Sequence, residues 1–278
     1  MIDLARAHAV AVEAAEAAGA VLAPGARFAV SAKGGAGDLV TDLDVRSERI
    51  IIDRLAAAFP GHAVLAEESG RTPGEGALWV IDPLDGTHNM TIGLPAYSVG
   101  VALCLDGAPA VGVVHDPVTG QTWSAVRGGG PLGPGGRPLP PPEPSPRRGL
   151  IVSYVVGYPV SRDDPTAMAH LYVLNRGCSR VLQLWSPQLT WIMLARGLID
   201  AVIAYRAGPV DLPAGALIAT EAGARITTLD GAPFPIHVDA PEHTFVAARP
   251  ETAATLLPLL ASADGLRMPE PAGGVTGR

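Results

Sequence analysis

Carboxylate side chains stand at places in the chain where a folded core has no need of a charge. They are Asp44, Glu67, Asp82, Asp85 and Asp211. Each lies at the end of a predicted strand or the start of a predicted helix. Ligand sites of layered α/β proteins gather at such places. These residues are therefore the candidates for chemistry.

Carboxylates held close together are costly unless a cation neutralises them. With backbone carbonyls and water they form an oxygen-rich site of the kind that Mg²⁺ prefers. Two such ions, about 3.5–4 Å apart, could clamp a phosphoryl group and lower the pKa of an attacking water. Gly86 follows Asp85 and permits close approach of the backbone to an anion. The amides after it would point at a phosphate if a helix begins there.

Each carboxylate taken singly has a simpler interpretation. Asp38 and Thr41 are equally typical of helix caps, and Asp211 of the N-cap of a following helix. Glu68 is typical of a solvated surface carboxylate, and Asp85 of an ordinary Asp-Gly turn. The interpretation as a site depends on their joint spacing.

Apolar periodicity and turn residues predict the elements that must position these side chains. Residues 31–38 are predicted as a flexible loop, and Asp106-Gly107 as a hairpin turn. Helices are expected at 2–22, 41–59, 166–176, 187–196 and 213–222, and strands at 62–66, 78–81, 97–105, 110–115, 121–126, 150–156 and 200–205.

Residues 128–149 hold most of the low-complexity sequence, rich in glycine and proline. Such a segment does not form a core and is typical of an extended, partly polyproline II connection, so the Pro-rich stretch 131–146 is predicted as a loop. We therefore expect an α+β domain at 1–140 with most of the metal ligands. An α/β domain at 147–265 would carry Asp211 and the substrate wall, and 266–278 would be a flexible tail.

Composition excludes several classes of protein. The 278 residues are 48% hydrophobic and 17% charged, which excludes wholesale disorder. A net charge of −7 argues against a nucleic-acid binder with a basic face, and two cysteines are too few for a disulfide scaffold. No secretory signal or membrane span is recognisable, so a cytoplasmic protein is expected. The histidines show no pair at zinc-ligand spacing.

Several stretches together are similar to the inositol monophosphatase family of Mg²⁺-dependent, lithium-sensitive phosphatases. They are 38–44 (DLVTDLD), 66–69 (AEES), 79–90 (WVIDPLDGTHNM), 210–215 (VDLPAG) and 221–224 (EAGA). Their order and spacing extend the resemblance from about residue 5 to about residue 250. It implies an α/β fold, a layered αβαβα sandwich of the inositol monophosphatase and fructose-1,6-bisphosphatase type.

The resemblance also implies metal ligands. Glu67, Asp82 and the Leu84 carbonyl would hold a first Mg²⁺. A second Mg²⁺ would be held by Asp82, Asp85 and Asp211. Loss of Asp82 is expected to be the most damaging single change, because it would affect both ions.

Catalytic and phosphate-binding roles follow from the same resemblance. Asp44 and Glu67 would serve a weaker third metal site through water. Thr87, linked to Asp44, would orient and activate the nucleophilic water, while the amides of Gly86 and Thr87 would receive the phosphate. Lys33, the only lysine of the chain, aligns with a family lysine beside the active site. A lone surface lysine is its simpler interpretation.

The sequence departs from the family at the substrate wall. Ala204 falls where inositol-processing members carry a glutamate that binds ring hydroxyls. Trp185 and Pro187 replace small residues within 183–191, and Arg206 is a candidate for a different substrate contact or for a surface position. These departures favour a sugar phosphate, histidinol phosphate, nucleotide-type or specialised-metabolite phosphate over inositol 1-phosphate.

The sequence thus predicts a phosphoric monoester hydrolase that acts on a small phosphorylated metabolite by metal-activated water. The expected assembly is a homodimer without nucleic-acid or membrane partners. The alternative is a catalytically idle relative that binds a phosphorylated ligand or a protein partner.

Overall fold

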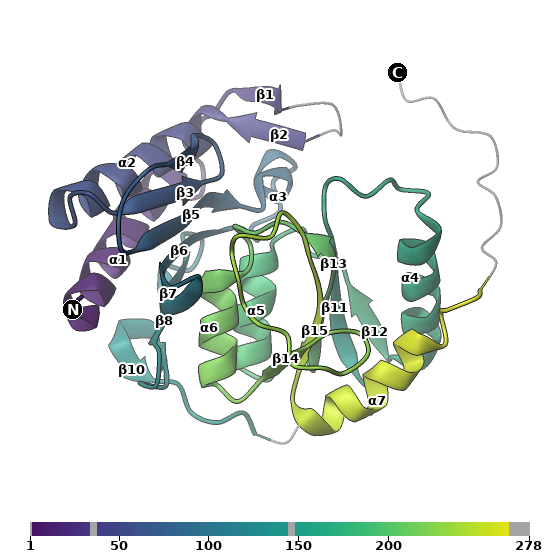
Figure 1. Cartoon of the computed structure of the whole chain (residues 1–278). Helices are drawn as coiled ribbons and strands as arrows, with labels where there is room; N and C mark the ends of the chain where they lie inside the picture. Colours follow the sequence, from purple (N-terminus) through teal and green to yellow (C-terminus); the bar gives the residue numbers. More distant parts are fainter. Residues whose placement is uncertain (1, 34–37, 144–147, 267–278) are drawn as a thin grey trace.

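The computed structural model describes residues 2–33, 38–143 and 148–266 (Figure 1). Its helices are α1 (Leu4–Gly19), η1 (Ala20–Leu22), α2 (Asp42–Ala58), α3 (Thr87–Thr91), η2 (Pro134–Gly136), α4 (Pro165–Gly177), α5 (Pro187–Ala195), α6 (Pro213–Glu221) and α7 (Pro250–Ala261). Its strands are β1 (Val30–Lys33), β2 (Asp38–Thr41), β3 (Ala63–Ala66), β4 (Gly70–Thr72), β5 (Leu78–Asp85), β6 (Ser98–Leu105), β7 (Ala108–Asp116), β8 (Gln121–Val126), β9 (Pro131–Gly133), β10 (Arg137–Pro138), β11 (Ile151–Val156), β12 (Arg180–Leu182), β13 (Ala201–Ala207), β14 (Arg225–Thr227) and β15 (His243–Ala248).

Most of these strands belong to two sheets. Among the described residues, an eight-stranded sheet has the order β10-β9-β8-β7-β6-β5-β3-β4 and a five-stranded sheet the order β12-β11-β13-β15-β14. The first is mainly antiparallel, apart from the parallel pair of β3 and β5. The second is mixed, because β11 pairs in parallel with β12 and β13 while β15 pairs antiparallel with β13 and β14.

Alternation along β5 explains how the layers stack. Successive side chains of a strand point to opposite faces. Trp79 and Ile81 therefore pack against α1 and α2, while Leu78 and Val80 face a core shared with α5 and α6. That second core also takes in β13 and β15 of the smaller sheet, whose other face is covered by α4 and α7. The sequence of helices, sheet, helices, sheet and helices is visible in Figure 1 and confirms the predicted layered α/β fold.

Most predicted elements form near the expected places, and two expectations need correction. The segment 31–38 was expected as a loop, but Val30–Lys33 pairs antiparallel with Asp38–Thr41; residues 34–37 lie outside the described residues. Within 128–149, short strands β9 and β10 extend the large sheet through β8, so part of the predicted connection is sheet. Residues 144–147 of that connection, and 267–278 of the predicted tail, also lie outside the description.

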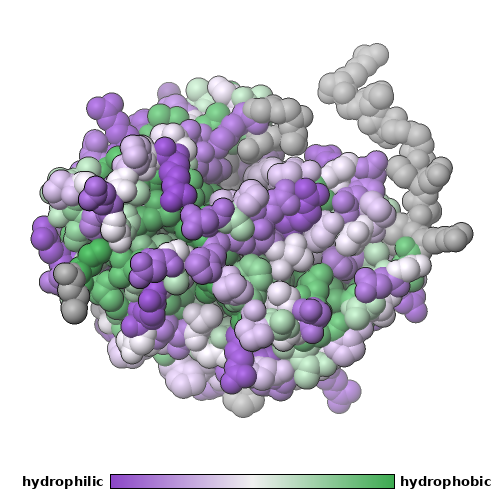
Figure 2. Space-filling view, in the orientation of Figure 1, coloured by the Kyte–Doolittle hydropathy of each residue, from purple (hydrophilic) through white to green (hydrophobic). Residues whose placement is uncertain are grey.

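The molecular surface mixes hydrophilic and apolar side chains on the face seen in Figure 2. Within the described chain, we find no helix with both the length and the apolar character that crossing a bilayer requires.

Candidate metal-binding active site

Three carboxylates converge where β5 ends. Asp82 and Asp85 come from β5, and Asp211 comes from the segment between β13 and α6. One carboxylate oxygen from each lies within 4.8 Å of the others. Asp82 and Asp85 are buried and Asp211 is half-buried. Asp211 is not the N-cap of α6, because Leu212 occupies that position and Pro213 begins the helix. The simpler interpretation of Asp211 as a cap is therefore wrong.

Three donors hold one oxygen of Asp85. Its Oδ2 accepts hydrogen bonds from Ser98 Oγ at 3.0 Å, Ser186 Oγ at 2.6 Å and the Gln188 backbone N–H at 2.9 Å. Ser98 begins β6, while Ser186 and Gln188 lie at the start of α5. The carboxylate that ends β5 is thus fixed by both the large sheet and the middle helix layer.

Asp44 and Thr87 form a second buried group. Thr41 is the N-cap of α2, and its backbone N–H donates to Asp44 Oδ2 at 2.8 Å in a capping box. Thr87 Oγ1 lies 2.9 Å from Asp44 Oδ1 and 3.0 Å from the Leu84 carbonyl oxygen, and can donate to either. Thr41, rather than Asp38, therefore caps this helix, and Asp38 lies in β2.

Glu67 directly follows β3 and shares a lysine with its neighbour. Lys33 Nζ lies 2.7 Å from a Glu68 carboxylate oxygen and 3.4 Å from a Glu67 carboxylate oxygen. The carboxylate of Glu48 on α2 accepts hydrogen bonds from the backbone N–H groups of Glu68 and Ser69. These contacts hold the turn after β3 beside the other carboxylates.

Burial raises the pKa of three of these carboxyl groups, those of Glu67, Asp82 and Asp85. It raises the pKa of Glu67 to about 8, with Lys33 opposing and Asp211 reinforcing the shift. The pKa of Asp85 rises to about 7 although Ser186 and Ser98 donate to it. The pKa of Asp82 is raised well above its ordinary value, first by burial and then by the charges of Glu67, Asp85 and Asp211. These carboxyl groups are therefore costly to ionise together unless a further cation offsets their charges.

The donors present fit a hard divalent cation. Asp82 Oδ1 is buried and has no hydrogen-bond partner among the described residues, which is costly for a polar atom unless a ligand completes it. Carboxylate oxygens are the donors that Mg²⁺ takes in preference to softer ligands. The residues of this cluster are thus suited to Mg²⁺ in number, kind and charge.

The turn after Asp85 is built for close backbone approach. Gly86 has φ 94°, a conformation that side chains disfavour, and is followed by the short helix α3. A Cβ atom at Gly86 would lie 2.9 Å from the Ala96 carbonyl oxygen and 3.2 Å from Ser186 Cβ. Asn89 secures this turn, because its Nδ2 donates to the carbonyl oxygens of Ala96 and Leu184, each at 2.6 Å.

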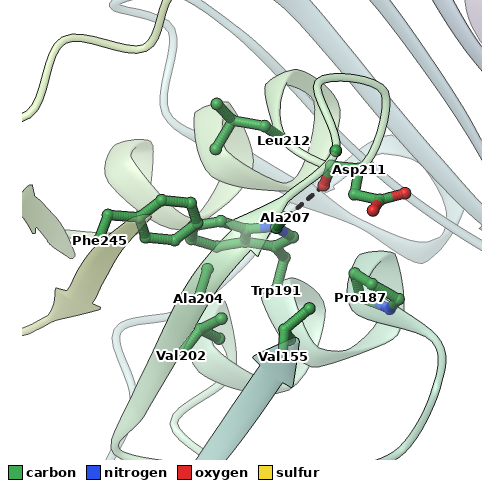
Figure 3. Close-up of a pocket in the computed structure, with 10 residues that line it drawn as sticks. Val155, Pro187, Trp191, Val202, Ala204, Ala207, Asp211, Leu212 and Phe245 are labelled. Carbon is green, nitrogen blue, oxygen red and sulfur yellow. Dashed lines mark hydrogen bonds between the residues drawn. The ribbon is translucent and has the colours of Figure 1, made fainter. Parts of the chain in front are cut away.

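The predicted substrate wall is divided in space. Ala204 is buried and lines an apolar pocket with Trp191 and Phe245 (Figure 3). In the same view the carboxylate of Asp211 points away from the two rings, while the Trp191 indole N–H donates to its carbonyl oxygen at 3.2 Å. The guanidinium of Arg206 binds the carboxylate of Glu242, with Nη2 to Oε1 at 2.9 Å.

Trp185 lies elsewhere on the wall, next to the Gly86 turn. It is 62% exposed, and its carbonyl oxygen is 3.3 Å from the position of a Cβ at Gly86. The structure thus places Trp185 next to the Gly86 turn, whereas Arg206 makes an ion pair with Glu242, and the predicted substrate contact of Trp185 stays a prediction.

Sequence reasoning missed the residues that hold the carboxylates. Ser98, Ser186 and the Gln188 backbone all donate to Asp85. The Ser-Pro pair at 186–187 signals a helix start, and Ser98 is the second residue of the strand predicted at 97–105. Neither signal says which distant carboxylate the hydroxyl would bind.

Comparison with known proteins decides the family. The sequence model described as "Inositol monophosphatase family" matches residues 3–264. The chain belongs to the inositol monophosphatase family. Members are Mg²⁺-dependent phosphoric monoester hydrolases, so both the predicted family and the predicted class of enzyme are confirmed.

Relatives within the family carry different names. The chain is 33% identical over 196 residues to "Nus factor SuhB" of Pasteurella multocida, covering 70% of this chain and 73% of that one. It is 32% identical over 202 residues to "Fructose-1,6-bisphosphatase/inositol-1-monophosphatase" of Thermotoga maritima, covering 73% and 76%. The crystal structure of the extragenic suppressor protein suhB from Bartonella henselae superposes with a TM-score of 0.80 at 27% identity, covering 93% and 98%.

Proposed function

We propose that this member of the inositol monophosphatase family hydrolyses a small phosphate monoester other than inositol 1-phosphate, with two Mg²⁺ ions. The observation that supports turnover most directly is the convergence of Asp82, Asp85 and Asp211 oxygens within 4.8 Å. All the carboxylates expected of a working site are present in this chain.

Glu67, Asp82 and the Leu84 carbonyl would hold one ion, and Asp82, Asp85 and Asp211 the other. Bound Mg²⁺ would polarise the phosphate and lower the pKa of a water molecule. The protein's part is to hold these oxygens rigidly, since phosphoryl transfer depends mainly on positioning and charge neutralisation. Ser98 and Ser186 do so for Asp85.

Thr87 and Asp44 would orient and activate the attacking water. Thr87 Oγ1 donates to Asp44 Oδ1 and so presents its lone pairs to a water hydrogen. Burial raises the pKa of Asp44, which makes this carboxylate a better proton acceptor. The backbone N–H groups of Gly86 and Thr87 would bind the phosphate oxygens, and Lys33 would add positive charge beside Glu67.

The substrate wall supports a substrate that is not inositol 1-phosphate. Ala204 offers a methyl group in a buried apolar pocket, so it provides no hydrogen bond to a ring hydroxyl. Trp185 stands next to the Gly86 turn, with its carbonyl oxygen 3.3 Å from the position of a Cβ at Gly86, and it brings a large exposed ring where the family carries a small residue. A sugar phosphate, histidinol phosphate or nucleotide-type phosphate is the class of ligand that we infer.

Phosphate release with Mg²⁺ and with EDTA tests this function. A suitable panel contains inositol 1-phosphate, histidinol phosphate, fructose 1,6-bisphosphate, 3′-phosphoadenosine 5′-phosphate and several sugar phosphates. We expect Mg²⁺-dependent release from one of them and little from inositol 1-phosphate. Retained Mg²⁺ binding with no release from any ester would instead favour a role in binding. Relatives named Nus factor SuhB keep that second candidate open.

Asp82→Asn is the decisive variant. It should lower Mg²⁺-dependent turnover at least about 100-fold, because losing only an outer partner of a metal site already costs about 10–100-fold. Mg²⁺ should also raise the melting temperature of this variant less than that of the wild type. Asp53→Asn, on the exposed face of α2, is the matched control. Near-normal turnover of Asp82→Asn would refute the mechanism.

We also propose that the protein is a homodimer, as the resemblance implies, and that it is cytoplasmic, as its two cysteines suggest. Light scattering of the purified protein tests the assembly, and a single protomer mass would exclude the dimer.

A further inference from the structure

Three aromatic residues lie at or next to the Gly86 turn, Trp185 through its backbone carbonyl, His88 on α3 and Tyr158 through its stack on His88. Trp185 is 62% exposed and Tyr158 is 56% exposed, although large apolar rings are usually buried. The His88 ring, on α3 next to Thr87, stacks on the Tyr158 ring with 6.3 Å between centroids and 29° between planes. Together these three residues form what we call the aromatic rim.

Hydrogen bonds of the two neighbouring residues hold the backbone of Trp185 against the candidate site. Asn89 Nδ2 binds the Leu184 carbonyl on one side of it, and Ser186 Oγ binds Asp85 on the other. Trp185 has φ 57°, a strained conformation for a bulky residue that persists only when its surroundings impose it. The strained backbone of Trp185, a residue with an exposed indole, is thus held next to the residue pair Ser186 and Asp85.

The other side of the rim is equally constrained. Tyr158 follows Gly157, whose backbone N–H donates to the Tyr205 carbonyl at 3.0 Å. A Cβ atom at Gly157 would overlap the Arg206 carbonyl, so this close approach requires glycine. The stack on His88 then joins Tyr158, from the smaller-sheet half, to the turn that follows β5.

We propose that the aromatic rim is a stacking platform for a planar aromatic group on the alcohol part of the substrate, as in a nucleoside monophosphate. This inference rests on the proposed function and narrows its substrate class. Indole and phenol rings offer flat faces without net charge, so they select a partner by stacking rather than by charge. The Trp185 backbone lies against Gly86 and the Tyr158 ring stacks on His88, the residue after Thr87, so a partner on the rim would lie near the phosphate that the turn would bind.

Matched pairs of esters test the platform. Adenosine 5′-monophosphate and ribose 5-phosphate share the ester but differ in the base, while benzyl phosphate and cyclohexylmethyl phosphate differ in whether the ring is planar. We expect kcat/KM to favour the planar member of each pair by about 5- to 150-fold, the range that one stacked base contributes. Most of this preference should lie in KM.

Substitutions in the aromatic rim test whether these residues cause the preference for planar esters. Trp185→Gly removes the indole while easing the positive φ, and Tyr158→Ala removes the stacked phenol. Each should bring the ratio of kcat/KM between paired esters towards one, whereas Trp185→Phe should keep most of it. Tyr172→Ala is the control, because Tyr172 is another exposed tyrosine but lies on α4 against Arg176. It should leave the ratio unchanged.

The outcomes separate this inference from the hydrolase itself. Equal kcat/KM within both pairs, or a preference that survives both Trp185→Gly and Tyr158→Ala, would overturn the platform. If no ester of these pairs and none of the earlier panel releases phosphate, the proposed function fails, and calorimetric binding in Mg²⁺ buffer then decides about the rim. Tighter binding of adenosine 5′-monophosphate than of ribose 5-phosphate, lost in Trp185→Gly, would sustain the platform; equal binding would refute it.

Discussion

At the scale of single residues, Thr87 connects the two chemical parts of the site. Its hydroxyl lies between Asp44 on α2 and the Leu84 carbonyl on β5, and its backbone opens the turn at Gly86. A hydroxyl with one hydrogen can donate to one acceptor while its lone pairs accept from water. The position therefore suits a group that orients a nucleophile without binding metal itself.

Thr87→Val keeps the shape of the side chain and removes the hydroxyl. Turnover should fall about 100-fold or more, since a positioned proton-transfer group contributes about 10²–10⁴-fold. Thr87→Ser should recover most of the activity, because the hydroxyl is restored. Steady-state kinetics with saturating Mg²⁺ measures both variants.

A second threonine supplies the control for that prediction. Thr119 Oγ1 donates to Asp116 at 2.7 Å in an exposed turn, so Thr119→Val breaks a similar bond away from the site. It should leave turnover unchanged. Similar activity of Thr87→Val and Thr119→Val would contradict the role assigned to Thr87.

At the scale of elements, the middle helix layer is packed too closely for ordinary side chains. A Cβ atom at Gly215 on α6 would lie 2.4 Å from Trp191 Cβ on α5. A Cβ atom at Gly112 on β7 would lie 2.5 Å from the Ala214 carbonyl oxygen. These two glycines let α6 press against both α5 and the large sheet, and Trp191 then holds the backbone of Asp211.

Gly215→Ala should therefore lower the free energy of unfolding by about 1–3 kcal/mol, the usual cost of overpacking a core. It should also raise the Mg²⁺ concentration needed for half-maximal activity, because α5 and α6 must separate near Asp211. Chemical denaturation and Mg²⁺ titration measure the two effects. Gly133→Ala is the control, since its Cβ would meet its nearest atom at 3.5 Å with φ −98°. Equal free energies of unfolding for Gly215→Ala and Gly133→Ala would contradict this prediction, because they would show that α5 and α6 can accommodate the added methyl group.

Elements with a strong local pattern could be predicted from sequence. The strands around Asp106-Gly107 and their turn form as expected, with φ 51° and 76° at the two turn residues. The pairing of β1 with β2 was missed because the segment is short and rich in glycine, and its strands depend on each other rather than on an apolar face. Strand β15 and helix α7 were not predicted either.

In the candidate site, too, some residues could be predicted from the sequence and others could not. Motif spacing was enough to select Asp82, Asp85 and Asp211, which lie together as their joint spacing suggested. The hydroxyls that hold Asp85 come from residues far apart in the chain, so no local pattern could identify them. The ion pair of Arg206 with Glu242 was equally inaccessible, because it depends on how β13 and the segment before β15 meet.

At the scale of the whole molecule, the carboxylate cluster makes stability depend on pH. Burial raises the pKa of Glu67 from 4.5 to about 8 and that of Asp85 from 3.8 to about 7. The folded metal-free protein therefore binds more protons than the unfolded chain between these limits. Stability from these groups is complete below the unfolded values and is lost as pH rises through about 7 to 8.

In EDTA, the melting temperature should accordingly be lower at about pH 8.5 than at about pH 5.5. Mg²⁺ should reduce this fall, because a bound cation stabilises the ionised carboxylates, so the stabilisation by Mg²⁺ grows with pH. Differential scanning calorimetry in both buffers measures the effect. Asp82→Asn should flatten the EDTA curve by removing one of the repelling charges. A melting temperature in EDTA that rises over this interval would contradict the assigned pKa directions.

The position of α6 late in the chain has a consequence for biosynthesis. A ribosome delivers β5, β6 and β7 long before it delivers the helix that covers one face of them. Until α5 and α6 emerge, the nascent sheet exposes Val80, Ala102 and Val114 to solvent, and Asp82 and Asp85 lack Asp211. Exposed apolar strands of this kind aggregate or recruit chaperones. Completion of the carboxylate cluster therefore coincides with the end of that vulnerable period of translation.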